Sequence, residues 1–503
     1  MARIAVIGAG MGAMAAAARL AVAGHRVVVH ERTQTYGGGV RRYERDGFGF
    51  DTGPGLLPLP AVWRDLFVKT GKEPLEACVD LVQVDPSSCH VFADGTRVSL
   101  PNASRAGVVA ALDESLGAGA GRRWGDFLVR AREAWDRTRR PLLEEPLWPN
   151  WQVLAEREPY PAVPHKRLLR TRRAGTLHEI GAWELRDERL ACLLESHALA
   201  HGLDPRTAPA SAAVLPYLEH AFGMWYVRGG MRELARAVYE RCVARRVEFA
   251  FGAEVTAVVG KDGRAAGVEL ADGTVAGADH VVAGVDPVRL RDLTGRPLDG
   301  DGDGDVRASP VATGRFTLLL ALRGEREPGA AHRTVVHAPD RGAEPAFAAS
   351  SGVDGAGRPT VTVLRPDDPA LRPDGAHESA VVSAVAPADG AWEDGERVRH
   401  WTDLLLEAAR PALPDLRERL LWHEARTPGH TGEETGAHHG AVPAPALAAG
   451  DGRFLHAANT TRLPGLYRVG GWSHPGGGLP HSGMSGALVA GLIVEGPEFR
   501  GSR

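Results

Sequence analysis

The sequence of 503 residues has few cysteines, no strong excess of one charge and no long uncharged apolar run. Its four cysteines lack the spacing of metal ligands, and a disulfide framework is not expected, which favours a reducing compartment. The formal net charge is −4, so nucleic acid is not expected as a partner. Aromatic residues make up only 6% of the chain, and the sequence shows no internal repeat.

The N-terminus leaves no room for a signal peptide, because a strand pattern starts at residue 3. No apolar run reaches the roughly 18 residues needed to span a bilayer. We therefore expect a cytoplasmic protein, and peripheral contact with a membrane stays open. No metal site is expected: the segment 301–305 (DGDGD) starts like a calcium loop, but Val306 and Ala312 stand where such a loop needs Gly and Glu.

The first 31 residues have the pattern of a dinucleotide-binding βαβ unit. Residues 3–7 (RIAVI) and 27–30 are apolar and predict two strands, and the Ala-rich segment 13–23 between them predicts a helix stopped by Gly24. A glycine-rich turn joins the first strand to this helix, and an acidic residue, Glu31, ends the second strand. These elements match the Rossmann fingerprint in its required context.

Each residue of that fingerprint has a physical role. Gly8 permits the tight turn, and Gly10 lets a pyrophosphate approach the backbone at the helix N-terminus, with Gly12 and Ala13 in the remaining small positions. Glu31 is expected to accept hydrogen bonds from a ribose. The alternative is a glycine-rich turn in a unit that binds no nucleotide, which leaves the placement of the acidic residue unexplained.

The residues after Glu31 indicate which dinucleotide is bound. A glycine pair, Gly37 and Gly38, follows the ribose acid, and the segment 48–54 (FGFDTGP) comes soon after. This arrangement resembles the amine-oxidase-like flavoproteins and implies FAD. A second such fingerprint is absent from the sequence, so a built-in NAD(P)H site is not expected.

Over most of its length the chain resembles the bacterial-type phytoene desaturases, a family of FAD-dependent carotenoid desaturases. The most specific match is the closing motif GLYRVGGWSHPGGGLPHSGMSGALVAGLI, residues 465–493. Further matching segments are 79–100, 194–238, 252–259, 281–287 and 360–375. The resemblance implies an enzyme of carotenoid biosynthesis, an FAD-dependent oxidoreductase acting on an apolar small molecule.

The resemblance also implies an extended FAD site, with the backbone of Val255 offered to the adenosine. Beyond Gly8, Gly10 and Glu31, the residues expected to bind the cofactor are Met11, Gly12, Ala13, Arg32, Gly38, Gly39, Val40, Gly53, Pro54, Val255, Gly471, Gly478, Leu479 and Pro480. Relatives usually have Arg or Lys directly after the glycine pair, where this chain has Gly39. Arg41 and Arg42 follow shortly and are the candidates to replace that cationic contact.

The closing motif can also be interpreted from its residues. Gly476, Gly477 and Gly478 remove side chains where a ring system is expected to lie on the backbone, and Pro480 suits the first turn of a helix. The dipole of that helix would stabilise anionic reduced flavin. The alternative is a turn that serves close packing alone. His481 and His474 are the two candidates for a catalytic residue, and each has an alternative structural role.

The stretch 122–173 is rich in Arg and Trp and has two interpretations. The first is a helix that lies in the membrane interface and inserts the tryptophans at positions 124, 135, 148 and 151 into lipid. The alternative is a helical face of the substrate domain, and the many acidic residues here argue against strong attraction to anionic lipid. From residue 124 to 138 the apolar positions follow an i, i+3, i+4, i+7 pattern, which predicts an amphipathic helix.

We expect an α/β protein in which a Rossmann-type FAD-binding domain carries an inserted mixed-sheet substrate domain and a helical cap. The FAD-binding domain is predicted over 1–72, 222–290 and 440–503, and the substrate domain over 73–221 and 291–439. Three functions stay open: a desaturase of a carotenoid-like or other polyene, a flavin oxidoreductase or redox-neutral isomerase of a smaller metabolite, and an isoprenoid-binding protein without turnover. With one dinucleotide fold, reduced FAD is expected to be reoxidised by oxygen or a quinone.

Overall fold

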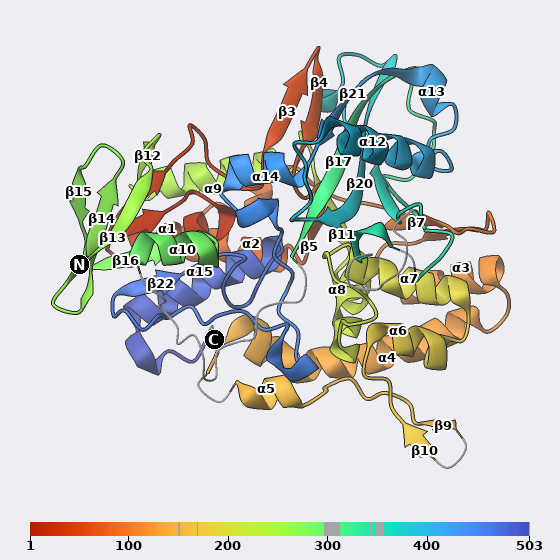
Figure 1. Ribbon diagram of the computed structural model, residues 1–503, viewed down its shortest axis with the longest axis horizontal. Coiled ribbons are helices and arrows are strands. Elements are labelled where there is room, and N and C mark those ends of the chain that lie inside the picture. Colours follow the sequence, from red (N-terminus) through yellow and green to blue (C-terminus); the bar gives the residue numbers. More distant parts are fainter. Residues whose placement is uncertain (149–150, 168–169, 296–311, 343, 348–356, 502–503) are drawn as a thin grey trace.

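The computed structural model describes residues 1–148, 151–167, 170–295, 312–342, 344–347 and 357–501. Figure 1 shows a nucleotide-binding type α/β unit on the left, a large sheet at the upper right and a layer of helices at the lower right. The segment 301–305, which resembles the start of a calcium loop, lies outside the described residues. No helix in the described part of the chain is both long and apolar enough to cross a membrane.

A five-stranded parallel sheet forms the centre of the α/β unit. Its strand order is β12-β2-β1-β16-β22, with β12 Glu248–Phe251, β2 Arg26–Glu31, β1 Arg3–Ile7, β16 His280–Ala283 and β22 Leu466–Arg468. Every neighbouring pair is parallel. All five strands come from the three segments predicted for the FAD-binding domain, although the domain boundaries themselves stay predictions.

Helices cover this sheet and bring the two ends of the chain together. They are α1 Met11–Val22, α2 Ala61–Thr70, α9 Arg232–Ala244, α10 Pro287–Thr294 and α15 Leu479–Val494. The small residues of α15 explain its close packing: a Cβ added at Gly486 would lie 2.6 Å from the Gly12 oxygen, and one at Gly483 would lie 2.8 Å from Val62. The thin side of α15 therefore packs against α1 and α2.

A small antiparallel sheet packs against the strands β1 and β16 of the parallel sheet. It consists of β13 Val255–Lys261, β14 Arg264–Leu270 and β15 Val275–Gly277. Asp262 and Gly263, which join the first two strands, both have positive φ values, of 51° and 76°. This is the turn geometry that two-residue hairpins favour.

The large sheet has seven strands in the order β21-β17-β20-β19-β18-β7-β8. They are β21 Leu420–Arg426, β17 Thr313–Arg323, β20 His377–Pro387, β19 Val361–Leu364, β18 Arg333–Val336, β7 Ser88–Val91 and β8 Arg97–Leu100. Only the pair β18 and β7 is parallel within this described sheet, so it is the mixed sheet predicted for the substrate domain. One face, with Phe316, Leu318 and Val382, packs under α12 Gly395–Ala409.

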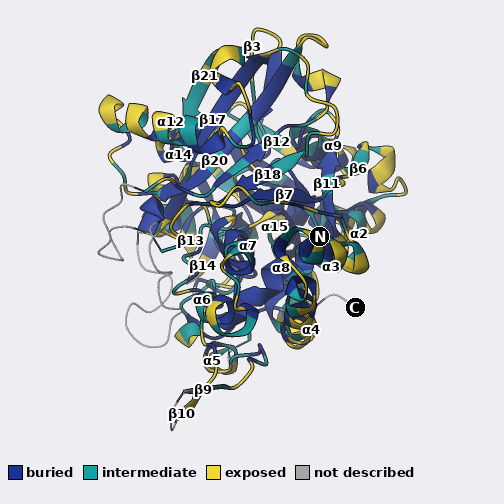
Figure 2. Cartoon of the chain, turned by 90° about the vertical axis from the view of Figure 1, so that its right-hand side faces the viewer, coloured by how far each residue is buried: buried dark blue, intermediate teal, exposed yellow. Residues whose placement is uncertain are grey.

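Helices cover the opposite side of the molecule. They are α3 Arg105–Leu116, α4 Ala120–Arg139, α5 Gln152–Glu156, α6 Leu177–Ile180, α7 Glu188–Leu199 and α8 Val214–Phe222. A short basic hairpin, β9 His165–Arg167 and β10 Arg170–Arg172, projects from this layer (Figure 1). In Figure 2, exposed residues lie on the outer turns of these helices and on the hairpin, and also on α12 and around β3.

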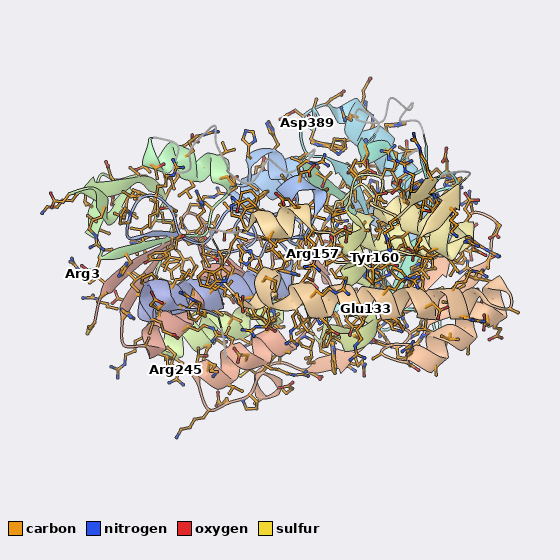
Figure 3. The ribbon with its side chains drawn as sticks, turned by 90° about the horizontal axis from the view of Figure 1, so that it is seen from below. Arg3, Glu133, Arg157, Tyr160, Arg245 and Asp389 are labelled. Atoms are coloured by element: carbon orange, nitrogen blue, oxygen red, sulfur yellow. The ribbon has the colours of Figure 1, made fainter. Side chains whose placement is uncertain are left out.

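The helix α4 corrects one interpretation of the sequence. It crosses the underside of the molecule with Glu133 on its outer face (Figure 3), whereas Trp124 and Trp135 are only 2% and 7% exposed and belong to the core of the helical layer. These two tryptophans cannot insert into lipid without unfolding that core. The amphipathic period was right, but its apolar face is the inner one.

The remaining elements connect the layers. The short strands β5 Leu57–Pro58, β11 Met224–Val227 and β6 Leu81–Gln83 form a three-stranded sheet between the α/β unit and the large sheet. The hairpin β3 Arg42–Arg45 and β4 Phe48–Asp51 packs on Trp422 of β21. The segment that returns to the α/β unit contains α13 Leu416–Arg419 and α14 Pro428–Thr435.

Candidate active site

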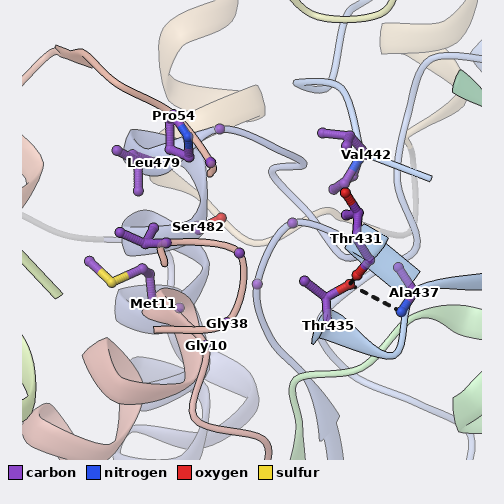
Figure 4. A pocket seen from close by; sticks show the side chains of 18 of the residues that line it. Gly10, Met11, Gly38, Pro54, Thr431, Thr435, Ala437, Val442, Leu479 and Ser482 are labelled. Atoms are coloured by element: carbon purple, nitrogen blue, oxygen red, sulfur yellow. Dashed lines mark hydrogen bonds between the residues drawn. The ribbon is translucent and has the colours of Figure 1, made fainter. Parts of the chain in front are cut away.

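A cavity of about 760 Å³ runs from the first turn of the α/β unit to the space between the large sheet and the helices α7 and α8. In Figure 4, Gly10, Met11, Gly38, Pro54, Leu479 and Ser482 lie on one side of the cavity, and Thr431, Thr435, Ala437 and Val442 on the other. Segments from both ends of the chain and from its middle therefore build one continuous wall.

The first turn forms an anion site at one end of this cavity. Gly8 has a φ of 89°, which glycine adopts without strain, and the chain then turns into α1 with Gly10 at its N-cap. Met11, Gly12 and Ala13 line the cavity, and no side chain caps the helix or carries negative charge in its first turn. A Cβ added at Gly10 would meet no described atom within 4 Å, so free space lies in front of this backbone. Such a helix end suits a pyrophosphate.

Glu31 lies at the end of β2, beside the same turn. One carboxylate oxygen accepts a hydrogen bond from the Ala9 amide at 2.8 Å, and the other accepts from the amide and hydroxyl of Thr33. The side chain is 7% exposed and borders the cavity. Because each carboxylate oxygen has two lone pairs, these bonds orient Glu31 and leave acceptor capacity for a ribose.

A strip of backbone continues along the cavity from residue 37 to residue 54. A Cβ at Gly53 would lie 2.0 Å from the Gly39 oxygen, so these two glycines let the segments 38–40 and 52–54 run side by side. Arg41 borders the cavity, where it donates to the carbonyl oxygens of Gly38 and Glu434. Arg42 is not among the lining residues and instead donates to Gly229 and Ala370. Arg41 is therefore the arginine placed to supply the cationic contact.

The closing motif lies where it was predicted, but its glycines divide into two groups. Gly471, Gly478, Leu479 and Pro480 line the cavity at the N-terminus of α15. Gly476 and Gly477 do not, since a Cβ at either would lie within 2.7 Å of backbone atoms in the segment 443–446. The expectation that all three consecutive glycines face a ring system is therefore wrong for two of them, which serve close packing.

Of the two histidine candidates, only His481 lines the cavity. His474 is fully buried, its Nε2 is 2.9 Å from the Glu145 oxygen, and it is not among the lining residues. It fixes the turn and does not reach the cavity. His481 does line the cavity in the first turn of α15, and burial lowers its pKa to about 4. It is therefore neutral at pH 7.

All residues predicted to bind the cofactor border this cavity. They are Gly8, Gly10, Met11, Gly12, Ala13, Glu31, Arg32, Gly38, Gly39, Val40, Gly53, Pro54, Val255, Gly471, Gly478, Leu479 and Pro480. Their individual contacts with FAD stay predictions. The chain brings them together from three segments that are distant in sequence, which is the arrangement that one elongated cofactor requires.

Sequence reasoning missed the other half of the cavity. The large sheet turns a polar face toward it, with Thr317 of β17, Ser383 of β20 and Thr362 of β19 side by side. Two arginines of this sheet, Arg315 and Arg333, also border the cavity. The available signal was the short polar–apolar alternation in 315–318, but alternation alone does not tell which face is covered by a helix.

Histidines complete the polar wall. His90 of β7 and His197 and His201 at the end of α7 line the cavity. Burial lowers the pKa of His197 and of His201 to about 3, and nearby arginines, Arg333 and Arg315 respectively, add to the effect. The Nδ1 atom of His90 lies 3.0 Å from Nε2 of His337. These imidazoles are neutral at pH 7 and act as hydrogen-bonding groups.

Comparison with known proteins assigns the family. The family model for flavin containing amine oxidoreductase matches residues 14–494. The chain belongs to this family. Among curated relatives, it is 29% identical to the 4,4'-diapolycopene oxygenase of Methylomonas sp., in an alignment that covers 98% of each chain. It is 30% identical to the hydroxyneurosporene desaturase of Cereibacter sphaeroides, over 98% of this chain and 97% of that protein.

The phytoene desaturase (neurosporene-forming) of Cereibacter sphaeroides is 27% identical over 99% of this chain. Solved structures agree in fold. An oxidoreductase from Methanosarcina mazei matches 97% of this chain with a TM-score of 0.64 and 18% identity, and putrescine oxidase matches 98% with a TM-score of 0.65 and 14% identity. The predicted family and fold class are thus confirmed.

The protein is therefore an FAD-dependent oxidoreductase, as predicted, and the residues present fit the cofactor. The uncapped N-terminus of α1, the open space at Gly10 and the oriented carboxylate of Glu31 suit a diphosphate and a ribose. The N-terminus of α15 lies further along the same wall. When bound, FAD supplies hydride acceptance at its N5 atom. The protein supplies position and the exclusion of water.

Proposed function

We propose that this enzyme desaturates a carbon–carbon single bond of a carotenoid-like or other polyene or isoprenoid substrate. One carbon loses a hydride to flavin N5 and its neighbour loses a proton, so that a double bond forms. The observation that carries the proposal is the cavity, which continues from the cofactor wall into a part, here called the chamber, that is lined by Leu56, Leu215 and Leu218. Full-length similarity to curated carotenoid desaturases supports it.

The residues of the chamber bear on where the proton goes. Hydride loss beside a double bond leaves an allylic cation, which loses a proton without needing a strong base. The imidazole of His201 lies near those of His481 and His197, and each of the three is a weak proton acceptor at most because burial lowers its pKa. We propose that they orient the substrate and receive the proton only transiently.

A second candidate function is oxidation of a smaller, soluble metabolite on the same scaffold. The polar face with Thr317, Thr362 and Ser383 favours it, because a pure hydrocarbon leaves buried hydroxyls without partners.

We further propose oxygen or a quinone as the acceptor that reoxidises reduced FAD. We also propose that peripheral contact with a membrane uses the basic strands β9 and β10 rather than the buried tryptophans of α4.

Product analysis tests the proposed function. Holoenzyme is incubated in air, with and without an added quinone, with phytoene in detergent micelles and with geranylgeranoic acid, an isoprenoid carboxylic acid. We expect at least one product lighter than its substrate by two hydrogens, as detected by mass spectrometry. Recovery of every isoprenoid unchanged in mass, from protein that carries FAD, would contradict the proposal.

Replacing His481 with alanine is expected to lower turnover roughly tenfold without releasing FAD, because one polar contact at the chamber is lost while Gly10 and Glu31 still hold the other end of the cofactor. Turnover by the wild type should vary little between pH 6 and 8, since the pKa of His481 is lowered to about 4. His400→Ala, on the exposed side of α12, is the matched control. Full turnover by His481→Ala would remove the residue from the chemistry.

A further inference from the structure

Arg315 is a cation inside the protein without a carboxylate partner among the described residues. It lies on β17 and borders the cavity, where one terminal nitrogen donates to the Ala200 oxygen at the end of α7. Burial lowers the pKa of Arg315 to about 10, so the guanidinium stays charged at neutral pH. Because a guanidinium has five N–H donors, the bond to Ala200 leaves most of them available toward the described residues and the cavity.

The second arginine of the chamber, Arg333, differs from Arg315 because it has a carboxylate partner. Arg333 forms a bidentate ion pair with Glu219 of α8, and its Nε donates to the Ser87 oxygen at 3.1 Å. The same carboxylate lies 3.5 Å from Nδ1 of His197. Glu219 is thus occupied by Arg333, whereas Arg315 has no carboxylate partner within the part of the chain that the structure describes.

Uncharged imidazoles and hydroxyls lie near Arg315. His201 is close enough to Arg315, His197 and His481 for these groups to lower its pKa, and the imidazoles are uncharged at pH 7. Hydroxyl groups extend the polar region across the sheet, because Thr317 is paired in register with Ser383, and Ser383 with Thr362. All of these residues line the cavity, and among the described residues they form a polar wall whose charge comes from Arg315.

The same cavity has an apolar wall. Leu56 and Met224 pack in one small cluster with Leu364, and all three line the cavity, together with Pro58, Leu59, Leu215, Leu218 and Val335. These side chains suit an apolar segment of a ligand. A hydrocarbon that filled the whole cavity would instead cover Arg315 and the hydroxyls without replacing their hydrogen bonds to water, which is unfavourable.

We propose that the substrate is an amphiphile, an apolar isoprenoid chain that bears an anionic oxygen group, and that Arg315 binds this group. The anion supplies acceptors for the free N–H groups of Arg315, and the chain lies along the leucine-rich wall. The shared chemistry is a carboxylate or a phosphate. The proposal rests on the proposed function for the identity of the apolar part of the substrate. It also accounts for a polar wall in an enzyme whose relatives are carotenoid desaturases.

Binding of one chain with three head groups tests this directly. Holoenzyme is titrated with geranylgeranoic acid, geranylgeranyl diphosphate and geranylgeraniol, and affinity is measured from the perturbed flavin spectrum and by calorimetry, with no turnover required. We expect one of the two anions to bind roughly 10- to 150-fold more tightly than the alcohol, which is the range of a buried charge-assisted contact. Preference for the acid indicates a carboxylate, and preference for the diphosphate indicates a phosphate.

Variants of Arg315 assign the preference to this residue. Arg315→Gln is expected to bring the anion down to the affinity of the alcohol, with the alcohol and FAD content unchanged, and Arg315→Lys should keep most of the preference. Arg323→Gln is the matched control, since Arg323 is exposed at the other end of β17 and does not line the cavity.

Several outcomes would overturn the inference. Equal affinity of the three ligands in the wild type, or no binding of either anion, contradicts it without any variant. Equal weakening of acid and alcohol by Arg315→Gln indicates a structural role as a cap on α7, and loss of FAD indicates a cofactor contact. If Arg315→Gln does not fold, the wild-type comparison and Arg315→Lys decide. Desaturation of phytoene without any preference for anions leaves the proposed function standing and removes this inference alone.

Discussion

Replacing Gly10 with valine is expected to abolish FAD binding while the protein stays folded. Gly10 has a φ of −70° and a ψ of 164°, an extended conformation that valine adopts readily, and an added Cβ would meet no described atom within 4 Å. The branched side chain would occupy the space in front of the α1 N-terminus, where a diphosphate is expected. The ratio of FAD to protein should fall from near one to near zero, as measured by the flavin absorbance of purified protein.

The matched control is Gly375→Val, an exposed position outside the cavity where an added Cβ also meets nothing within 4 Å. It should keep its FAD. Circular dichroism should show the same secondary structure in both variants. Full FAD content in Gly10→Val would mean that the diphosphate lies elsewhere and that the cofactor site is wrongly placed.

Acidification is expected to destabilise the protein strongly between pH 7.5 and 5.5. Burial lowers the pKa to about 3 for His197, His201 and His337 and to about 4 for His456, His474 and His481, against 6.5 for an ordinary histidine. The unfolded chain therefore binds more protons below pH 6.5, and stability is lost as the pH falls through that value.

Three buried carboxyls act in the opposite direction, because burial raises the pKa of Asp51 to about 6 and of Glu158 and Glu344 to about 7. They are protonated in the folded state at a pH where the unfolded chain is not, so they favour folding as the pH falls from 7 toward 4.5. The histidines are more numerous, and a net loss of several kcal/mol is expected. The corresponding fall in Tm is roughly 3–5 °C for a chain of this length.

Calorimetric scans of the holoenzyme at both pH values measure this fall. His201→Gln should reduce the pH dependence, because it removes one imidazole that is neutral in the folded state. His400→Gln, at an exposed position of α12, should leave it unchanged. A Tm that stays constant or rises on acidification would contradict the assignment of neutral, buried histidines.

The cofactor half of the site was predictable because its determinants are local. A strand, a glycine turn, a helix and an acidic strand end within the first 31 residues fix where a pyrophosphate and a ribose lie, and the structure places Gly10 and Glu31 on one cavity. The closing motif is likewise contiguous, which is why Leu479 and Pro480 were found. The roles of Gly476 and Gly477 were not local, since they depend on the segment 443–446 packing against them.

The substrate half was not predictable, because it depends on which face of each strand meets which layer. In 313–323, Phe316 and Leu318 turn toward α12, and this packing leaves Arg315 and Thr317 to face the cavity. The local sequence does not indicate that the face with Phe316 and Leu318 is the one covered by α12, a helix distant in the sequence. The same limit explains Trp124 and Trp135, whose helical period was clear but whose apolar side covers the core of the helical layer.

Anaerobic titration of the FAD-loaded enzyme tests the central claim most directly. Phytoene and geranylgeranoic acid are added separately while the flavin absorbance near 450 nm (roughly, for flavin cofactors in general) is recorded. The account predicts that about one equivalent of at least one of them bleaches the bound flavin, and that oxygen or a quinone then restores the absorbance. A flavin that neither isoprenoid bleaches, but that NADPH alone reduces quickly, would contradict the account and indicate a reductase or a redox-neutral isomerase.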